Sequence, residues 1–428
     1  MNRFKLSQFN NAISNNNSYL IYNSLSGELV KINQELVTDL ENIESNSSIN
    51  LNDERFKYLF DKGFIVNQDT DEFSRVEILK NQLIFSEYGE RVSFVIALTT
   101  MCNLKCLYCY ENGVPVHTMT NTTAADVCSF IKDRLDNNKL VKELNITWFG
   151  GEPLLNIEQI QNIGNFVKLY CNNNNIQLST NIITNGLLLT KYNIRILQEF
   201  NLKNMQISMD GYVDFYNKYK NVGVLELKNL IQTISNICDK IHITIRLNSS
   251  KDNIESIKKL CKTLYEIEPI RNNVKISIAQ IISEKVNSLN NKEFSETKLA
   301  LLKYINDIGW KNQIDNFVPV PKTIPCGLMQ ATNFVIDPMG YLYKCEHYIG
   351  QPEYSIGDVK KGVTYPSFYA EFINVPLKKE CNSCSIYPVC RGGCTQRRYE
   401  KETSVNCEEK KKEVLDILNL YYNNYLLK

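Results

Sequence analysis

The sequence predicts an α/β protein in which six strand-helix units lie between a small N-terminal module and a Cys-rich C-terminal region. Two observations support this organisation. Short apolar runs alternate with amphipathic helical stripes through the middle of the chain, and ten of the fourteen cysteines fall into two closely spaced arrays. We expect the three regions to span residues 1–85, 90–312 and 313–428.

Composition limits the classes of function. The chain has 428 residues, of which 43% are hydrophobic, enough for more than one domain. The formal net charge of +1 gives no overall basic field, so nucleic acid is not an expected partner. No apolar run approaches the roughly 20 residues needed to cross a bilayer, and the first residues do not resemble a secretory signal. We expect a cytoplasmic protein with no membrane partner, whose reduced cysteines bind metal.

The N-terminal residues from about 18 to 70 predict a separate small unit. Apolar residues at 19–22 and 29–32 flank a turn-rich break, which indicates a hairpin. Helical stripes follow at 36–43 and 56–60. A hairpin and two helices make a winged-helix-like module. It has no basic recognition helix, so we do not expect it to bind DNA, and a purely structural cap is the alternative to a recognition role.

The middle of the chain alternates between strands and helices. Amphipathic stripes such as 127–135 and 227–234 predict helices between the strands. Parallel strands need such crossovers, so the helices should cover a parallel sheet whose ligands bind at the carboxyl ends of the strands. The first loop at that edge begins after Thr99. The six expected strands are 94–98, 144–149, 182–184, 205–209, 241–247 and 274–282.

This first loop carries a C-x3-C-x2-C array, Cys102, Cys106 and Cys109. Three thiolates on one loop can hold a [4Fe–4S] cluster and leave one iron without a protein ligand, where a small chelating molecule can bind. A zinc site is the alternative, but structural zinc takes four ligands, and the nearest histidine, His117, has an unrelated spacing.

Polar or glycine-rich segments end the next strands. Gly150-Gly151-Glu152 follows the second strand, where the glycines allow a ligand to approach the backbone and the carboxylate is placed to accept from a ligand ammonium. Asn185 and Ser208 end the third and fourth strands, as binding residues or as ordinary turn residues. Arg246, near the end of the fifth strand, is placed to clamp a carboxylate, with a surface ion pair as the alternative.

Together the cysteine triplet, the segment 150–153 and the six βα units resemble the radical S-adenosylmethionine superfamily, over about residues 93–310. The resemblance implies a partial (βα)6 TIM-like barrel and a [4Fe–4S] cluster on the triplet. It implies that S-adenosylmethionine chelates the open iron and that one electron cleaves it to methionine and a 5′-deoxyadenosyl radical. The implied cofactor contacts are Tyr108 at the adenine, Gly150, Gly151 and Glu152 at the methionine ammonium, and Asn185 and Ser208 at the ribose or the methionine. Arg246, placed to clamp a carboxylate, is also expected to bind the cofactor.

A second group of seven cysteines lies in the C-terminal region. Its spacing includes C-x2-C-x5-C-x3-C, and zinc ribbons are the alternative to iron–sulfur sites. The spacing resembles the SPASM extension of radical enzymes that act on peptides. By that resemblance Cys381, Cys384, Cys390 and Cys407 hold a distal [4Fe–4S] cluster, and Cys326, Cys345 and Cys394 hold a proximal one, which makes three clusters in all. Some relatives have one more cysteine upstream. Here residues 317–325 have none, so one proximal position lacks a cysteine.

The combined resemblance implies a peptide maturase of the sactipeptide or ranthipeptide type, which forms thioethers. Peptide-maturing relatives often begin with a module that binds a leader peptide as an added strand. The expected partners are a ribosomal precursor peptide, with a leader and a Cys-containing core, and a reductant such as flavodoxin or ferredoxin. Alternatives are a sulfatase-maturing enzyme that makes formylglycine, a carbon–carbon crosslinking maturase, and a non-catalytic iron–sulfur protein that binds peptides or transfers electrons. The sequence does not identify the catalytic base, and the four remaining cysteines should pack as small hydrophobes.

Overall fold

The computed structural model describes residues 3–15, 18–46, 49–220, 222–401 and 406–425. The chain divides into two compact units. The first, here called the terminal unit, comprises Met1–Phe85, Phe317–Gly327 and Asn374–Lys428. The second, the sheet unit, comprises Ser86–Asn316 and Leu328–Ile373. Among the described helices none has both the length and the apolar character needed to cross a membrane.

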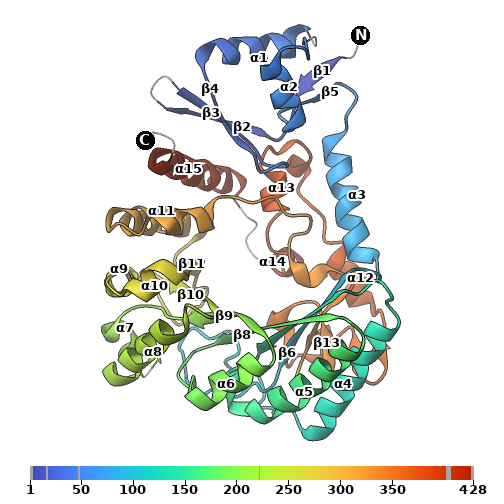
Figure 1. Cartoon of the computed structure of the whole chain (residues 1–428), viewed down its shortest axis with the longest axis vertical. Helices are drawn as coiled ribbons and strands as arrows, with labels where there is room; N and C mark the ends of the chain where they lie inside the picture. Colours follow the sequence, from blue (N-terminus) through green and yellow to red (C-terminus); the bar gives the residue numbers. More distant parts are fainter. Residues whose placement is uncertain (1–2, 16–17, 47–48, 221, 402–405, 426–428) are drawn as a thin grey trace. The chain divides into compact units, whose positions relative to one another are not determined.

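The sheet unit contains all six predicted strands. They are hydrogen-bonded in the order β11-β10-β9-β8-β7-β6, and every pair is parallel (Figure 1). Along β7, Leu144, Ile146 and Trp148 are buried, whereas Asn145 and Thr147 on the opposite face are half-buried. The prediction of a parallel α/β sheet is confirmed. The strands are β6 Arg91–Ala97, β7 Glu143–Phe149, β8 Gln177–Thr184, β9 Leu202–Ser208, β10 His242–Ser249 and β11 Val274–Gln280.

Helices follow these strands and cover the outer face of the sheet (Figure 1). The predicted apolar stripes of α4 and α8 are buried, as are the four cysteines expected to pack as hydrophobes. The helix α11 begins with a capping box in which Asn290 and Glu293 bond each other's backbone N–H. The helices are α4 Asn121–Asp136, α5 Ile157–Asn173, α6 Lys191–Glu199, α7 Val213–Lys220, α8 Val224–Ile237, α9 Ile254–Tyr265, α10 Glu268–Asn273 and α11 Asn291–Asp307.

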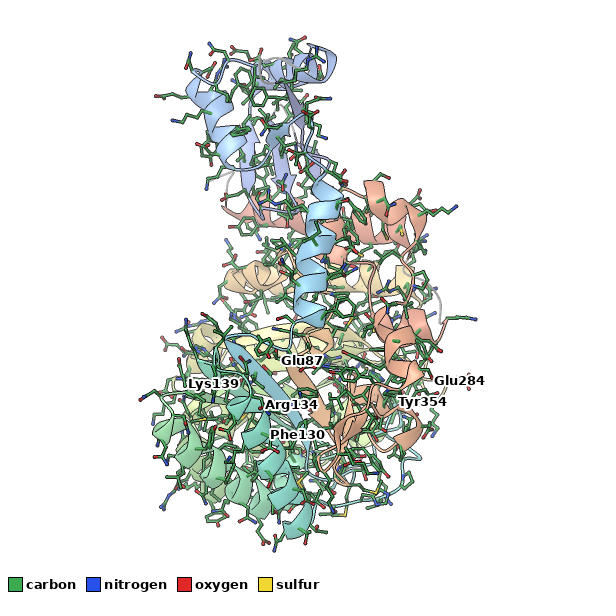
Figure 2. The ribbon with its side chains drawn as sticks, turned by 90° about the vertical axis from the view of Figure 1, so that its right-hand side faces the viewer. Glu87, Phe130, Arg134, Lys139, Glu284 and Tyr354 are labelled. Atoms are coloured by element: carbon green, nitrogen blue, oxygen red, sulfur yellow. The ribbon has the colours of Figure 1, made fainter. Side chains whose placement is uncertain are left out.

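The sheet continues beyond the predicted region. Strand β12 (Asn333–Ile336) pairs in parallel with β6, and three antiparallel strands follow it. Phe334 of β12 stacks on Phe94 of β6, and the guanidinium of Arg134 lies 5.2 Å from the ring centroid of Phe334. The same guanidinium lies 5.2 Å from the ring centroid of Phe130 (Figure 2). Part of the predicted C-terminal region therefore completes the sheet unit. The added elements are β13 Tyr341–Tyr343, η4 Glu346–Tyr348, β14 Gly357–Asp358, β15 Gly362–Val363 and α12 Ser367–Ile373.

The terminal unit joins the N-terminal module to the end of the chain. The predicted hairpin is present as β3 and β4, and both predicted helices form, as α1 and α2. The structure adds strand β2 to the hairpin, a β1-β5 pair and the helix α3, none of which the sequence pattern indicated. The elements are β1 Phe4–Leu6, β2 Asn10–Asn15, β3 Ser18–Asn23, β4 Leu29–Ile32, α1 Gln34–Asn46, α2 Glu54–Asp61, β5 Ile65–Asn67, α3 Glu72–Phe85, η6 Lys379–Ser383, α13 Tyr387–Cys390, α14 Thr395–Tyr399 and α15 Cys407–Tyr425.

Both faces of the β2-β3-β4 sheet are buried within this unit. Ile21 and Ile32 pack with Leu36 and Leu40 of α1. On the other face a second cluster joins the sheet to the last helix, α15; its members include Ile13, Leu20, Tyr22, Val414, Leu418 and Tyr422. Apolar burial is the main source of folding free energy, so the module and the chain end stabilise each other. They are one folding body rather than two independent ones.

Candidate functional site

The cysteine triplet lies on the loop after β6, and its three thiols are half-buried. Burial raises the pKa of each thiol, that of Cys109 to about 11. The charges of Cys106 and Cys102 raise the pKa of Cys109 further, so the three thiols are near enough to interact. Such thiols ionise when a metal binds them, because coordination stabilises the thiolate. Tyr108, on the same loop, is also half-buried.

Gly150 and Gly151 pack against the backbone that begins this loop. A Cβ atom on Gly150 would overlap the carbonyl oxygen of Thr99, and one on Gly151 would lie 2.5 Å from the carbonyl oxygen of Met101. Gly150 also has a φ of +129°, which side-chain-bearing residues rarely adopt. Backbone N–H groups at Gly151 and Glu152 donate to Thr99 and Met101 at 2.9 and 3.0 Å. The glycines therefore fix the start of the cysteine loop, and their contact with a ligand stays a prediction.

Glu152 connects the ends of two strands. Its carboxylate is fully buried and accepts from the Thr184 hydroxyl at 2.8 Å, the Asn185 N–H at 2.9 Å and the Leu154 N–H at 3.1 Å. Burial raises the pKa of Glu152, and these hydrogen bonds oppose that increase. Since both oxygens accept from the protein, Glu152 holds the end of β8 against the end of β7. Its predicted contact with a ligand ammonium stays a prediction.

The end of β8 meets the cysteine loop through Asn185. Its side-chain amide donates to Asn103 at 2.8 Å and lies 3.7 Å from the sulfur of Cys102. Ser208 ends β9, and its carbonyl accepts from the ammonium of Lys220 and the hydroxyl of Tyr216, each at 3.0 Å. The structure therefore places Asn185 beside Cys102, whereas the predicted ligand contacts of Asn185 and Ser208 stay predictions.

A buried ion pair beside Cys106 was missed by the sequence analysis. The Lys220 ammonium lies 2.8 Å from the Asp210 carboxylate, and both side chains are buried. Burial alone lowers the pKa of Lys220, but Asp210, Tyr216 and Cys106 together raise it above its usual value. Lys220 in turn opposes the increase that burial causes in the pKa of Cys106. A fixed cation near Cys106 favours an anionic group there, such as a thiolate-bound cluster. The ten-residue separation of the pair fits no motif or periodicity, so no sequence signal indicated it.

Arg246 belongs to a hydrogen-bonded chain that starts at this ion pair. Its Nε donates to the side chain of Asn248 at 3.0 Å, and the amide of Asn248 donates to Asp210 at 2.8 Å. Burial raises the pKa of Glu346, and the charge of Arg246 opposes this increase, so the two charges interact. Arg246 is therefore part of the site's polar network. Its role as a clamp for a carboxylate stays a prediction.

The segment after Cys345 also approaches the triplet. The ring of His347 stacks on Tyr110 with centroids 4.4 Å apart, and Tyr110 directly follows Cys109 in the chain. Both residues belong to the sheet unit. One of the seven C-terminal cysteines therefore lies in the same unit as the triplet, in a segment packed on its loop. Cys326 and Cys394 belong to the terminal unit, and both are exposed.

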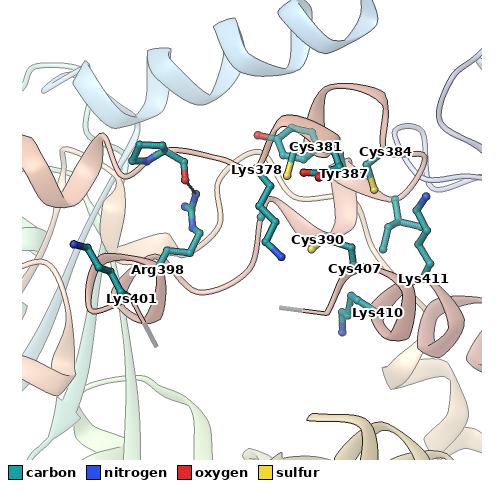
Figure 3. Close-up of a pocket in the computed structure, with 14 residues that line it drawn as sticks. Lys378, Cys381, Cys384, Tyr387, Cys390, Arg398, Lys401, Cys407, Lys410 and Lys411 are labelled. Atoms are coloured by element: carbon teal, nitrogen blue, oxygen red, sulfur yellow. Dashed lines mark hydrogen bonds between the residues drawn. The ribbon is translucent and has the colours of Figure 1, made fainter. Parts of the chain in front are cut away.

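Four of the C-terminal cysteines meet in one cavity. Cys381, Cys384, Cys390 and Cys407 line a space of about 340 Å³ inside the terminal unit (Figure 3). Burial raises the pKa of Cys381, and the charges of the other three thiols raise it further, so all four interact. These are the four residues that the resemblance to the SPASM extension assigned to a distal cluster.

The donor chemistry of both thiol groups fits an iron–sulfur cluster. A cubane uses one thiolate for each iron, so four thiols can bind all four irons and three thiols leave one iron open. Cys102, Cys106 and Cys109 are a set of the second kind, and the four cavity thiols are a set of the first kind.

The sequence of this chain is similar to a known family model and to known enzymes. Residues 96–264 match the family model of the radical SAM superfamily. The radical SAM cyclopropyl synthase TigE of Paramaledivibacter caminithermalis is 25% identical over 91% of this chain and 89% of its own length. A cysteine-type anaerobic sulfatase-maturating enzyme of Clostridium novyi is 25% identical over 69% of this chain and 86% of its own.

A solved structure with the same fold extends this agreement. Streptococcus suis SuiB, bound to its precursor peptide SuiA, matches with a TM-score of 0.52 and 15% identity, over 94% of this chain and 97% of that one. The matched family region contains the triplet, Glu152, Asn185, Lys220 and Arg246. The chain therefore contains a radical SAM domain over residues 96–264 and is an enzyme related to the maturating enzymes.

Proposed function

We propose that this enzyme uses S-adenosylmethionine and three [4Fe–4S] clusters to modify a ribosomally made precursor peptide, installing a thioether between a cysteine sulfur and a carbon of another residue. The observation that carries the proposal is the convergence of four thiols in one cavity of the terminal unit, beside an N-terminal module that shares its core. An auxiliary cluster and a peptide-binding module are the two additions that separate a peptide maturase from a minimal radical enzyme.

Within this proposal each thiol group has a role. Cys102, Cys106 and Cys109 would hold the first cluster, which with bound S-adenosylmethionine would supply the radical chemistry. Gly150 and Gly151 fix the cysteine loop, while Asn185 and Lys220 place a donor and a cation beside its sulfurs. The four cavity thiols hold the distal cluster. Cys326, Cys345 and Cys394 hold the proximal cluster, one iron of which then has no cysteine ligand.

The N-terminal module is proposed to bind the leader. Both faces of its three-stranded sheet are covered, so the part left for a peptide is an edge. Strand β4 forms one edge of this sheet, and an extended leader would add to it through backbone hydrogen bonds. SuiB, which is solved with a precursor peptide bound, supports a peptide as the substrate. Residues 1–85, 90–312 and 313–428 remain our proposed functional regions for leader, radical and auxiliary-cluster chemistry.

A carbon–carbon bond is the second candidate. The relative that aligns over 91% of this chain is named a cyclopropyl synthase, and a cyclopropane ring is closed by a carbon–carbon bond. Formylglycine formation has narrower support, because the sulfatase-maturating relative aligns with only 69% of the chain. The cavity thiols and the module are compatible with either crosslinking reaction.

Mass spectrometry of the reacted peptide separates these outcomes. The reconstituted enzyme is incubated anaerobically with S-adenosylmethionine, a reductant and the precursor peptide. A thioether removes two hydrogens and leaves one cysteine that resists alkylation, whereas a carbon–carbon bond removes two hydrogens and leaves every cysteine alkylatable. Formylglycine made from cysteine loses the sulfur. An unmodified peptide beside cleaved S-adenosylmethionine would reject all three assignments for that peptide.

A further inference from the structure

The cavity that contains the four thiols is lined mainly by cations. Besides the thiols, its described wall includes five cationic side chains and one carboxylate, that of Glu380. Thiolates that hold a [4Fe–4S] cluster give it a net negative charge, which a fixed cation nearby would offset. Burial and pairing decide which cation has this effect. The five are Lys378, Arg398, Lys401, Lys410 and Lys411 (Figure 3).

Backbone carbonyls hold Arg398 in the cavity wall. It lies on α14, and its Nη1 donates to the carbonyl oxygens of Val375 and Pro376 at 3.3 and 3.4 Å. The loop after Cys390 packs against it, because a Cβ on Gly392 would lie 3.4 Å from the same Nη1. All these residues belong to the terminal unit. The guanidinium is therefore fixed against the loop that follows a candidate cluster ligand.

In the described part of the chain, the guanidinium of Arg398 has no carboxylate partner, and its Nε is buried without a hydrogen-bond partner. Burial lowers the pKa of Arg398, and the charges of one tyrosine and three cysteines oppose this decrease. In order of effect they are Tyr387, Cys381, Cys394 and Cys390. A buried charge is normally paired, and a tyrosine is neutral at neutral pH. The three thiols are therefore the counter-charge available to Arg398 once a metal ionises them.

The other four cations are less suited to act on the cavity. Lys410 pairs with Glu413 at 3.0 Å, which offsets its charge. Lys378 and Lys401 are exposed, and Lys411 is half-buried on the first turns of α15. Water and salt screen exposed charges, whereas a desolvated charge acts more strongly on its neighbours. Arg398 is therefore the cation of this wall with the largest expected effect on a cluster.

We propose that Arg398 is the fixed counter-charge of the cluster on the four cavity thiols and that it raises the reduction potential of this cluster. The proposal rests on the proposed function, because it requires a cluster in the cavity. Reduction adds one electron to the cluster, with no bond formed or broken and no proton moved. The reduced cluster is the more negative form, so a nearby cation stabilises it more than the oxidised form. Arg398 therefore shifts the equilibrium toward the reduced cluster.

The test measures the reduction potential of the distal cluster in the full-length, anaerobically reconstituted enzyme. Dithionite supplies the electrons, and paramagnetic resonance follows the reduced cluster at a series of fixed potentials. The distal signal is the one that Cys381→Ala/Cys384→Ala removes. In Arg398→Gln we expect the equilibrium constant for one-electron reduction to fall about tenfold, which lowers the potential by about 59 mV. Arg398→Lys keeps the charge and should stay much closer to the wild-type potential.

Arg397, the neighbouring residue on α14, is the matched control. It is half-buried and is not among the residues that line the cavity, and Arg397→Gln changes the net charge by the same amount. This variant should keep the wild-type potential and iron content. A second measurement needs no variant: high salt should change the wild-type potential little, because buried charges are screened much less than exposed ones. A large fall at high salt would assign the effect to the exposed lysines and overturn the role of Arg398.

Each outcome has a distinct meaning. A wild-type potential in Arg398→Gln, with full iron, would overturn the proposal and leave the proposed function intact. Loss of the distal cluster in Arg398→Gln but not in Arg398→Lys would support the proposal, because the charge is then what stabilises the cluster. Equal effects of both substitutions, on the potential or on the iron content, would show that the charge is not the cause and would reject it. If Cys381→Ala/Cys384→Ala removed no iron from the wild-type content, the cavity would hold no cluster, and that part of the proposed function would fail instead.

Discussion

The ammonium of Lys220 lies 2.8 Å from the carboxylate of Asp210, in the interior of the sheet unit. The same ammonium donates to the carbonyl of Ser208 at 3.0 Å and acts electrostatically on Cys106. This pair therefore joins the end of β9 to the loop that carries the cysteine triplet. Its energetic role and its effect on the site can be separated by mutation.

The substitution Lys220→Met should lower the free energy of unfolding by about 3–5 kcal/mol, because it leaves the charge of Asp210 buried without a partner. The double variant Lys220→Met/Asp210→Asn should recover most of that loss, since no buried charge remains. Urea unfolding of the apoprotein measures both. Lys218→Met, an exposed change on the same helix, is the control and should shift stability by less than about 0.5 kcal/mol. A double variant as unstable as the single one would show that the pair's charge is not the cause.

The substitution Gly150→Ala should disrupt the start of the cysteine loop. The new Cβ overlaps the carbonyl oxygen of Thr99, and φ is +129°. We expect a loss of about 2 kcal/mol or more in stability and weaker S-adenosylmethionine binding, measured by thermal unfolding and by calorimetry. Gly89→Ala is the matched control in the same unit, because its Cβ would make only ordinary contacts at 3.8 Å. If the two substitutions lowered stability and S-adenosylmethionine binding equally, Gly150 would have no special role in the loop.

Much of the sheet unit is predictable because its signals are local. Each strand is a short apolar run, and each crossover helix has a complete buried stripe, as in α4 and α8. The triplet and the four cavity thiols were predictable because their spacing in the chain is itself the chemical signal.

The remaining features depend on contacts between distant parts of the chain. Strand β12 pairs with β6 across more than 200 residues, and its four residues resemble any short buried segment. The core shared by Tyr22 and Tyr422 joins the two ends of the chain. Lys220 resembled a surface lysine until the fold buried it beside Asp210. Glycines at 150 and 151 indicated a close approach correctly, but the sequence did not reveal that the approaching group is the backbone at Thr99 and Met101.

Replacing Cys102, Cys106 and Cys109 together by Ala should remove one cluster of three. Iron should fall from about 12 to about 8 atoms per chain, and cleavage of S-adenosylmethionine should stop. The auxiliary signals should persist, because the cavity thiols belong to the other unit. Iron analysis, paramagnetic resonance and chromatography of 5′-deoxyadenosine measure the three effects. Cys261→Ala, a buried cysteine on α9, is the control and should keep all the iron. Persistent cleavage in the triple variant would show the triplet to be misassigned.

Deleting residues 1–85 should destabilise the distal site as well as weaken peptide binding. The sequence pattern alone predicts an independent module, whose removal would leave slow, uncoupled cleavage of S-adenosylmethionine. In the structure Phe9 and Val76 pack with Cys381 and Tyr387, two residues that line the thiol cavity. The deletion therefore removes apolar contacts that bury Cys381 and Tyr387. We expect lower iron content and a lower unfolding temperature in the truncated protein.

Leader recognition is therefore better tested in the intact chain. Hydrogen exchange should show slower exchange at residues 29–32 of β4 when the full precursor binds, and no change with a peptide that lacks the leader. Unchanged exchange in β4 despite tight precursor binding would place the leader elsewhere. A truncated protein with full iron and normal stability would contradict the shared core.

The bond formed by the enzyme depends on the proximal cluster. Two cubanes fully bound by cysteine need eight thiolates, and the C-terminal region contains seven. The four remaining cysteines, Cys128, Cys171, Cys238 and Cys261, are buried side chains of the sheet unit and are expected to pack as small hydrophobes. One iron should therefore be open or hold a ligand other than cysteine.

An open iron gives a substrate cysteine a physical reason to bind, because coordination deprotonates the thiol and positions its sulfur for attack by a carbon-centred radical. A Cys-containing core peptide should then perturb the auxiliary-cluster signal in paramagnetic resonance, and its Cys→Ser version should not. The product should lose two hydrogens per crosslink, and the modified cysteine should resist alkylation. If a carboxylate or histidine of the protein completes the cluster and product thiols stay alkylatable, the proposal of thioether formation is wrong. The carbon–carbon bond that the cyclopropyl synthase relative favours would then take its place, because that reaction needs a radical but no iron-bound sulfur.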